Sequence, residues 1–352
     1  MKVNSKPVEV TTKYLDITMA LPYQRNFIFI NGSRSIGKTY STLKWVIKQC
    51  KEHDCEFVYI VRTQDEKRAH ALEMAVQKVC INEYPAVPFI YDIEKMQMVI
   101  DEDEKYYATI GYCIALSEVQ KIKKRAYPKV KYMIFDEYML EKKDESSYIG
   151  GWNEPDKLLS LYHTIDREED RVIVFLLGNN TSFYNPYHLH PAFNIPMIPD
   201  GHIWMSENVI FWRACPSAEL KESRKDNKFL KMLEGSSYGD YAVQGEYIYD
   251  NVNLVEPLPA TTRYVLTMIY KGKQMGIYVH YSSNRVFISE KIDPSCKRIL
   301  ALTPEDVDEG IGLGDSRNTF VKWLKEKYKA GLLRYDAQET KSKFQLAISS
   351  IL

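Results

Sequence analysis

The sequence predicts an α/β protein whose larger domain is built on a mainly parallel β-sheet. In residues 1–213, short uninterrupted apolar runs alternate with longer amphipathic stretches, the pattern of a parallel sheet covered by helices. Residues 214–255 begin as a Lys- and Glu-rich helical segment, and residues 256–352 contain short strand-like runs separated by turn residues. We therefore expect an α/β domain, a short helical linker and a smaller α+β domain, with these boundaries.

Four apolar runs in the first domain are expected to form its buried strands. They are rich in β-branched and aromatic residues and lack polar interruptions, as in strands covered on both faces. These runs are Phe27–Ile30, Phe57–Val61, Tyr132–Phe135 and Val172–Leu177. Apolar residues at helical spacing predict helices at Thr39–Lys51 and Lys67–Val79.

The last domain is predicted to begin after a Pro-containing linker at Glu256–Thr262. Turn residues at Lys271–Gly272 and Ser282–Asn284 separate three runs, which predict an antiparallel meander. The predicted strands are Tyr264–Tyr270, Gly276–Tyr281 and Arg285–Ser289, and a helix is predicted near Thr319–Lys329.

Composition excludes several classes of protein. The chain has 352 residues, of which 45% are hydrophobic and 27% charged, so a disordered chain is excluded. No apolar run approaches the ~18 residues of a membrane span, and the N-terminus lacks the apolar core of a signal peptide. The six cysteines show no CxxC spacing, so we expect reduced thiols in a cytosolic setting.

The charge distribution shows one concentrated basic segment in a chain with 47 basic and 47 acidic residues. Gln120–Lys131 contains several lysines and an arginine but no acidic residue. A neutral protein can still bind phosphates through such a segment. The alternative is a solvated basic turn, because charge runs usually lie at the surface.

A complete phosphate-binding motif, G-x-x-x-x-G-K-T, lies between the first predicted strand and the first predicted helix. Its glycines allow successive N–H groups to point at phosphate oxygens. We expect Lys38 to reach the β- and γ-phosphates and the Thr39 hydroxyl to bind Mg²⁺. The expected phosphate-binding residues are Gly32, Ser33, Arg34, Ser35, Ile36, Gly37, Lys38 and Thr39.

Two carboxylates follow the third predicted strand. Because ligands bind at the carboxyl ends of parallel strands, Asp136 is expected to hold the Mg²⁺ shell. Glu137 is expected to orient and polarise the attacking water. A GTPase or nucleotide kinase often lacks the second acid, so the pair favours ATP hydrolysis by a mechanical-type ATPase.

Two further positions carry weaker signals. Asn179 follows the fourth strand and is either a γ-phosphate sensor or an ordinary turn residue. Arg167 lies in a mixed-charge segment, Asp166–Arg171, and is either a surface ion-pair residue or an arginine supplied to a neighbouring subunit. An arginine supplied by a neighbouring subunit stabilises the negative charge that develops in the transition state of hydrolysis.

The order of these motifs resembles the DNA-packaging ATPases of phi29-type phages, a branch of the large-terminase and FtsK/HerA-type motor ATPases. GSRSIGKT, KKRAYPKVKYMIFDEY and LLGNN carry the resemblance. Further matches run through most of the chain: Tyr23 with Arg25, Tyr148–Ile149, Asn185–Tyr187, Ser223–Lys225, Tyr238–Gly239, Asp293–Ser295 and Gly331–Asp336. Ser33 departs from the alanine of the closest relatives, a small change.

The resemblance assigns domains and roles. It implies a P-loop ATPase domain of the ASCE class at 1–213 and a vestigial nuclease-like (RNase H-like) domain at 256–352. Arg167 falls at the position of the family's trans-acting arginine, and Asn179 at its coupling asparagine. The predicted strands Tyr264–Tyr270 and Gly276–Tyr281 lack carboxylates, so we expect no two-metal nuclease activity.

The resemblance also implies a function: an ATP- and Mg²⁺-dependent motor that packages double-stranded viral DNA into a preformed procapsid. It implies a homopentameric ring at the procapsid portal in the host cytoplasm, and leaves open whether a packaging RNA takes part. In such a motor the basic segment would contact DNA phosphates through Lys121, Lys123, Lys124 and Arg125.

Two alternatives remain at this stage. One is another P-loop ATPase, such as a helicase, an FtsK/HerA-type translocase or a membrane-associated motor, although further helicase motifs are not found. The other is a non-enzymatic, nucleotide-gated scaffold at the portal. Intact Lys38, Asp136 and Glu137 argue against a scaffold.

Overall fold

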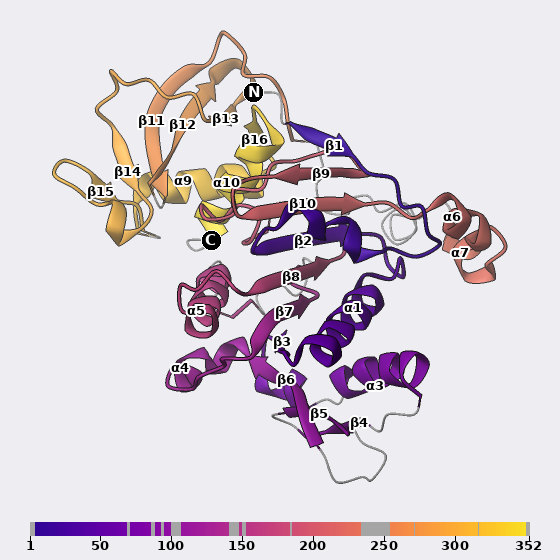
Figure 1. Ribbon diagram of the computed structural model, residues 1–352. Coiled ribbons are helices and arrows are strands. Elements are labelled where there is room, and N and C mark those ends of the chain that lie inside the picture. Colours follow the sequence, from indigo (N-terminus) through magenta and orange to yellow (C-terminus); the bar gives the residue numbers. More distant parts are fainter. Residues whose placement is uncertain are drawn as a thin grey trace. The chain divides into compact units, whose positions relative to one another are not determined.

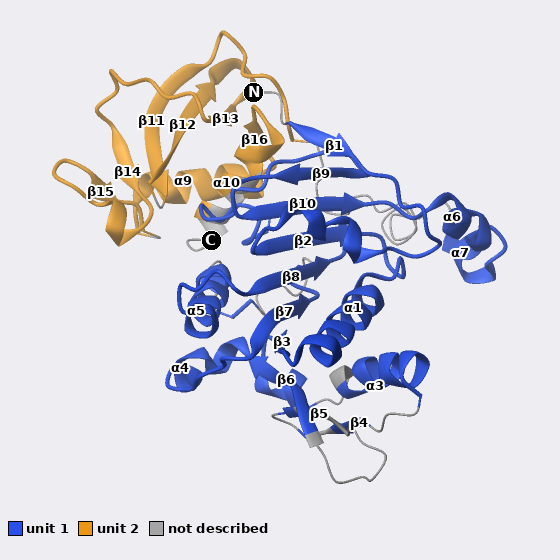
Figure 2. Ribbon diagram, in the orientation of Figure 1, with its two compact units in different colours: residues 1–249 blue, residues 250–352 orange. Residues whose placement is uncertain are grey.

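The computed structural model describes residues 4–68, 71–85, 89–92, 95–99, 107–140, 148–149, 153–183, 185–233, 254–270, 272–315 and 317–349. The chain divides into two compact units, residues 1–249 and 250–352 (Figure 2). Two helices of the expected linker, α6 (Ala218–Arg224) and α7 (Lys228–Leu233), are grouped with the first unit. The division into an ATPase domain, a linker and a nuclease-like domain stays a prediction, and Tyr238–Gly239 lies outside the described residues.

The described strands of the first unit form one sheet of ten strands in the order β1-β9-β10-β2-β8-β7-β3-β6-β5-β4 (Figure 1). The strands from β10 to β6 run parallel, and the strands at both edges are antiparallel. Their bounds are β1 Ser5–Pro7, β2 Phe27–Gly32, β3 Glu56–Val61, β4 Phe89–Tyr91, β5 Lys95–Val99, β6 Tyr107–Ala115, β7 Val130–Asp136, β8 Ile173–Gly178, β9 His202–Met205 and β10 Val209–Ala214.

The four predicted strands correspond to β2, β3, β7 and β8, which confirms the mainly parallel sheet. The helix predicted at Thr39–Lys51 is α1 (Lys38–His53), whereas the one predicted at Lys67–Val79 falls on α2 (Gln64–Arg68) and α3 (Ala71–Glu83). β10 was not predicted, although its sequence VIFWRA has the same apolar composition as the other strands.

Apolar side chains cover both faces of this sheet. In β2, Ile28 and Ile30 pack in the core on the side of α1, while Phe27 and Phe29 pack in the core on the side of α5 (Glu154–Asp166). This alternation follows from the two-residue period of a strand. Helix α1 buries a stripe at helical spacing, made of Leu43, Val46, Ile47 and Cys50.

The strand order determines where the functional residues meet. β8 is inserted between β2 and β7, and all three strands are parallel. In the register, Asn31 lies opposite Gly178, and Asp136 lies opposite Leu177. The phosphate-binding loop, the two carboxylates and Asn179 therefore follow strands that end at one edge of the sheet.

The second unit contains a six-stranded sheet in its described residues, ordered β15-β14-β11-β12-β13-β16. β11, β12 and β13 form the predicted meander, and β14, β15 and β16 are added parallel to their neighbours. This α+β arrangement fits the expected RNase H-like fold class. The bounds are β11 Arg263–Tyr270, β12 Lys273–His280, β13 Arg285–Ser289, β14 Ile299–Ala301, β15 Gly312–Leu313, β16 Leu333–Tyr335, α9 Thr319–Lys329 and α10 Gln338–Ser349.

The carboxylates of the second unit lie outside the first two strands of its meander. β11 and β12 contain no carboxylate, and Asp336 accepts hydrogen bonds from the hydroxyls of Ser289 and Thr340. Across the described parts of the chain, no group of three or more His, Cys, Asp or Glu side chains could hold a metal ion. Among the helices that the structure describes, none is long and apolar enough to cross a membrane.

Candidate active site

The loop between β2 and α1 depends on two glycines. Gly37 has a φ of 99°, a left-handed conformation that glycine adopts without steric cost. A Cβ at Gly32 would lie 2.6 Å from the carbonyl oxygen of Ala214, at the end of the neighbouring strand β10. The loop therefore favours glycine at both positions. At Gly37 the reason is the backbone conformation, and at Gly32 it is the lack of space for a side chain.

Lys38, the first residue of α1, is buried and its side chain contacts this loop. Its Nζ donates to the carbonyl oxygens of Gly32 at 3.0 Å and Ser33 at 2.9 Å, and to Oδ1 of Asn179 at 3.1 Å. Burial lowers the pKa of Lys38 to about 8, although the carboxylates of Asp136 and Glu137 oppose the shift. Asn179 thus contacts the motif lysine directly.

The side-chain oxygens of Asp136 and Thr39 lie next to each other. The Thr39 hydroxyl donates to Oδ2 of Asp136 at 2.6 Å, and the N–H of Glu137 donates to Oδ1 at 3.0 Å. Burial raises the pKa of Asp136, and the hydrogen bond from Thr39 opposes this shift. A carboxylate and a hydroxyl are hard oxygen donors of the kind that Mg²⁺ prefers, so the residues present fit that ion.

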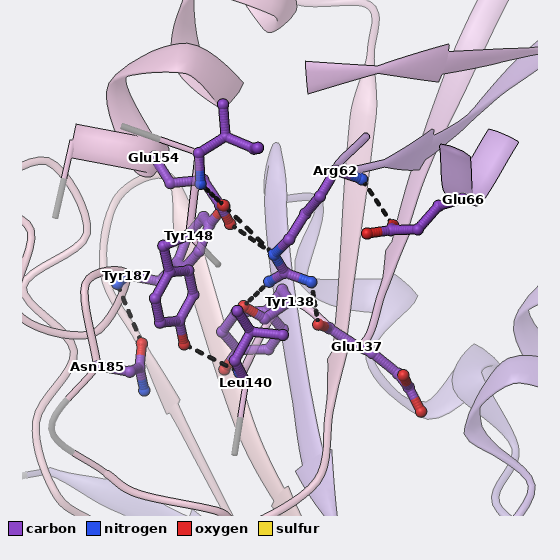
Figure 3. A network of polar contacts seen from close by, with 10 residues as sticks. Arg62, Glu66, Glu137, Tyr138, Leu140, Tyr148, Glu154, Asn185 and Tyr187 are labelled. Carbon is purple, nitrogen blue, oxygen red and sulfur yellow. Dashed lines mark hydrogen bonds and ion pairs between the residues drawn. The ribbon is translucent and has the colours of Figure 1, made fainter. Parts of the chain in front are cut away.

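Glu137 occupies a strained turn directly after β7. Its φ is 53°, which is uncommon for a residue with a side chain and persists only where neighbours hold it. Its carbonyl oxygen accepts a hydrogen bond of 2.8 Å from Nη1 of Arg62 (Figure 3).

A cavity of about 370 Å³ brings most of the predicted site together. This is within the usual size range of small-molecule sites, about 300–1,000 Å³. It lies at the N-terminus of α1, where unpaired N–H groups favour anions. Its lining residues are Arg34, Ser35, Ile36, Gly37, Lys38, Thr39, Tyr40, Asp136, Glu137, Leu177, Gly178 and Asn179.

Arg167 and the basic segment do not line this cavity. Arg167 follows α5 with a φ of 56° and precedes β8. It therefore lies on the side of the sheet where the parallel strands begin, whereas the cavity lies where they end. Its Nη2 is 3.5 Å from the carbonyl oxygen of Arg125. The four basic residues predicted to contact DNA are exposed and precede β7 at this same edge: Lys121, Lys123, Lys124 and Arg125.

Arg62 and Arg224 contact residues of the site, and Glu154 contacts Arg62, but none of the three is predicted from the sequence. Arg62 ends the apolar run of β3, and a polar residue at the carboxyl end of a strand was the signal used for Asp136 and Asn179. Its buried partner Glu154 gives no such signal. Arg224 of α6 donates to the carbonyl oxygen of Arg34 at 2.8 Å, and no local pattern indicates this contact.

Similarity to known proteins extends over nearly the whole chain. The sequence profile of the podovirus DNA encapsidation protein (Gp16) family matches residues 11–348. The DNA packaging protein of Bacillus phage B103 is 30% identical over 323 residues, which cover 90% of this chain and 95% of that protein. The DNA packaging protein of Bacillus phage phi29 is 28% identical over 322 residues, 90% of this chain and 92% of that one.

Solved structures agree with this result. A chain of the bacteriophage phi29 viral genome packaging motor assembly matches with a TM-score of 0.72 and 26% identity, covering 97% of this chain and 100% of that chain. The phi-28 gp11 DNA packaging motor has a similar fold, with a TM-score of 0.67 at 18% identity over 96% of this chain and 98% of that chain. The chain therefore belongs to the podovirus DNA encapsidation protein (Gp16) family.

Proposed function

We propose that this chain is the ATP-hydrolysing subunit of a motor that moves double-stranded viral DNA into a preformed procapsid. Membership of the DNA encapsidation family supplies the role in DNA packaging. One observation carries the proposal of ATP hydrolysis: Lys38, Thr39, Asp136 and Glu137 line one cavity at the N-terminus of a helix. A nucleotide-gated scaffold would not need Glu137 there.

The residues of the cavity divide into binding and chemical roles. The N–H groups of residues 32–39 and the Lys38 ammonium bind the phosphates of ATP. Thr39 and Asp136 would hold Mg²⁺, which would neutralise charge on the phosphates. Glu137 orients a water molecule and accepts its proton, and Asn179 responds to the γ-phosphate through its contact with Lys38.

Arg167 completes the site of a neighbouring subunit in this proposal. It lies at the edge of the sheet opposite its own cavity, so action in trans suits its position better than action in cis. A contact between unlike surfaces of identical subunits is head-to-tail, and such contacts form a ring when the rotation between subunits closes. The similar phi29 chain comes from a motor assembly, which supports an oligomer, and the resemblance implies five subunits at the portal.

The exposed residues Lys121, Lys123, Lys124 and Arg125 are proposed to contact DNA phosphates. Such contacts carry no sequence information, which suits a motor that must move any sequence. Because Arg125 contacts Arg167, this segment is also a candidate for the proposed subunit contact. A measurement of DNA binding distinguishes contact with DNA from contact with a neighbouring subunit.

The experiment that tests the proposal is steady-state ATP hydrolysis by the purified chain, with and without double-stranded DNA and procapsids. We expect DNA and procapsids together to stimulate hydrolysis, and Lys38→Ala to abolish it. If the wild-type chain hydrolyses no ATP under any of these conditions while packaging still proceeds, the proposed ATPase is wrong and the scaffold alternative is supported.

A further inference from the structure

Arg62 and Glu154 form a buried ion pair that contacts the main chain of Glu137 (Figure 3). Neither residue lines the cavity. Nε of Arg62 is 3.2 Å from Oε1 and 3.3 Å from Oε2 of Glu154. Arg62 is 4% exposed and Glu154 is 0% exposed. The guanidinium also lies over the rings of Phe135 and Tyr148, at 4.9 Å and 5.3 Å from their centroids.

The other two nitrogens of Arg62 bind the main chain of the catalytic turn. Nη1 donates to the carbonyl oxygen of Glu137 at 2.8 Å, and Nη2 donates to that of Tyr138 at 2.6 Å. A planar guanidinium presents its donors in a fixed fork, so binding these two consecutive carbonyls fixes the orientation of the two peptide groups on either side of Tyr138. These contacts hold Glu137 in its left-handed conformation, with a φ of 53°.

Glu154 is fixed in turn by two hydrogen bonds besides the ion pair. The N–H of Ile149 donates to Oε2 at 2.7 Å, and the hydroxyl of Tyr187 donates to Oε1 at 2.7 Å. Glu154 is also the first residue of α5, where the helix dipole favours a negative charge. The carboxylate is therefore an anchored counter-charge that sets the position of Arg62.

Burial of this ion pair carries a free-energy penalty from desolvation. Removing two charges from water is unfavourable, and apolar residues of similar volume often stabilise a fold at least as well. Fold stability alone does not explain why an ion pair occupies this position. The contacts of Arg62 with the two carbonyls provide an explanation, because an apolar side chain cannot bind them.

We propose that Arg62 and Glu154 are positioning residues for hydrolysis: Glu154 orients Arg62, and Arg62 holds the main chain of Glu137 so that its carboxylate faces the water. The inference rests on the proposed function, since it requires Glu137 to act on water. Neither residue contacts nucleotide in this scheme, so ATP binding does not depend on them.

The test uses Glu154→Gln and Arg62→Lys in the full chain. Glu154→Gln keeps the size and hydrogen-bonding oxygen but removes the charge, and Arg62→Lys keeps the charge but loses the fork. We expect kcat for ATP hydrolysis to fall about 10- to 100-fold in each, since a shift of about 1 Å at a reacting group costs about that much. KM and the Kd for ATP should change less than about threefold.

A matched control replaces another partly buried ion pair of the same unit. Arg213 and Asp200 lie 2.5 Å apart and do not contact Glu137. Asp200→Asn should therefore leave kcat unchanged. If Glu154→Gln does not fold, as judged by its thermal transition, Tyr187→Phe removes only the hydroxyl that binds Glu154 and should still lower kcat about threefold or more.

The outcomes separate this inference from the proposed function. Absence of ATP hydrolysis by the wild-type chain would overturn the function and the inference together. Wild-type hydrolysis with normal kcat in a folded Glu154→Gln or Tyr187→Phe chain would overturn the inference alone. A loss of ATP binding that matches the loss of kcat would also overturn it, because it would indicate a general disturbance of the cavity.

Discussion

At the scale of single residues, Lys38 shows how burial tunes a motif residue. Its ammonium is held by two loop carbonyls and the Asn179 amide, and the nearby carboxylates do not compensate for lost hydration. The pKa of about 8 lies below the ordinary lysine value of 10.5. Between these two values the folded chain binds fewer protons at this position than the unfolded chain, so this contribution to stability rises with pH.

The lowered pKa of Lys38 predicts a pH-dependent affinity for ATP. The phosphates bind the charged ammonium, which is lost as the pH passes through about 8. We expect the Kd for ATP, measured by calorimetry, to rise about tenfold from pH 7 to pH 9. In Lys38→Arg the cation keeps its proton throughout this range. Its Kd should therefore be constant, and an equal pH dependence in that variant would assign the effect to another group.

Asp136 and Glu137 are adjacent, but we expect different losses from them. Asp136→Ala removes a Mg²⁺ ligand and should lower Mg²⁺-dependent ATP binding. Glu137→Gln should bind ATP with near-normal affinity but hydrolyse it at least about 100-fold more slowly, because only the water-orienting carboxylate is lost. Equilibrium binding and single-turnover hydrolysis distinguish the two. Normal turnover by Glu137→Gln would refute its assigned role.

At the scale of elements, strand β8 places a site residue next to the cavity, and the short helix α4 (Val119–Ile122) places basic residues at the surface. β8 lies between β2 and β7 and brings Asn179 to Lys38. In α4, Val119 and Ile122 are buried in the core, whereas Lys121 is exposed and lies 3.4 Å from Glu118. Burial of the apolar side chains presents the basic side chains of this segment to solvent.

Neutralising this basic segment tests its proposed contact with DNA. Replacing Lys121, Lys123, Lys124 and Arg125 by glutamine should weaken DNA binding equally for all sequences. Each lost phosphate contact should reduce the slope of log affinity against log salt by about 0.9. Basal ATP hydrolysis should change little, while its stimulation by DNA and packaging should fall.

Helix α1 provides the control for this prediction. Its exposed lysines Lys44, Lys48 and Lys51 lie on a helix that covers the other face of the sheet. Their neutralisation should leave the salt slope unchanged. If the variant of the basic segment keeps its DNA affinity and slope, DNA is bound elsewhere. The next segment to test is then residues 256–352, which carry 15 basic and 11 acidic side chains.

At the scale of the whole molecule, the sheet of the first unit separates the cavity from Arg167. The cavity lies at the carboxyl ends of its parallel strands, and Arg167 lies where β8 begins. In the proposed function, one chain carries both parts of a site that it completes only with a neighbouring subunit. This is the arrangement expected of a subunit that acts on its neighbour in a ring.

Mixing of inactive subunits tests this arrangement. Arg167→Ala and Lys38→Ala should each abolish hydrolysis alone. In mixed oligomers, some contacts pair an intact Lys38 with an intact Arg167, so part of the activity should return. The mixing ratio should be varied and oligomer formation checked by light scattering. If mixed oligomers form but no ratio restores hydrolysis, Arg167 does not act in trans.

The sequence by itself determined the parallel strands, the phosphate-binding loop and the carboxylates after β7, because each depends on neighbouring residues and a repeating pattern. It also placed Asn179 after a strand, but only the strand order brought that side chain to Lys38. The pair of Arg62 and Glu154 is separated by 92 positions. Tertiary structure alone decides such a contact, since neither residue has a local pattern that identifies its partner and both charges become significant only once burial removes them from water.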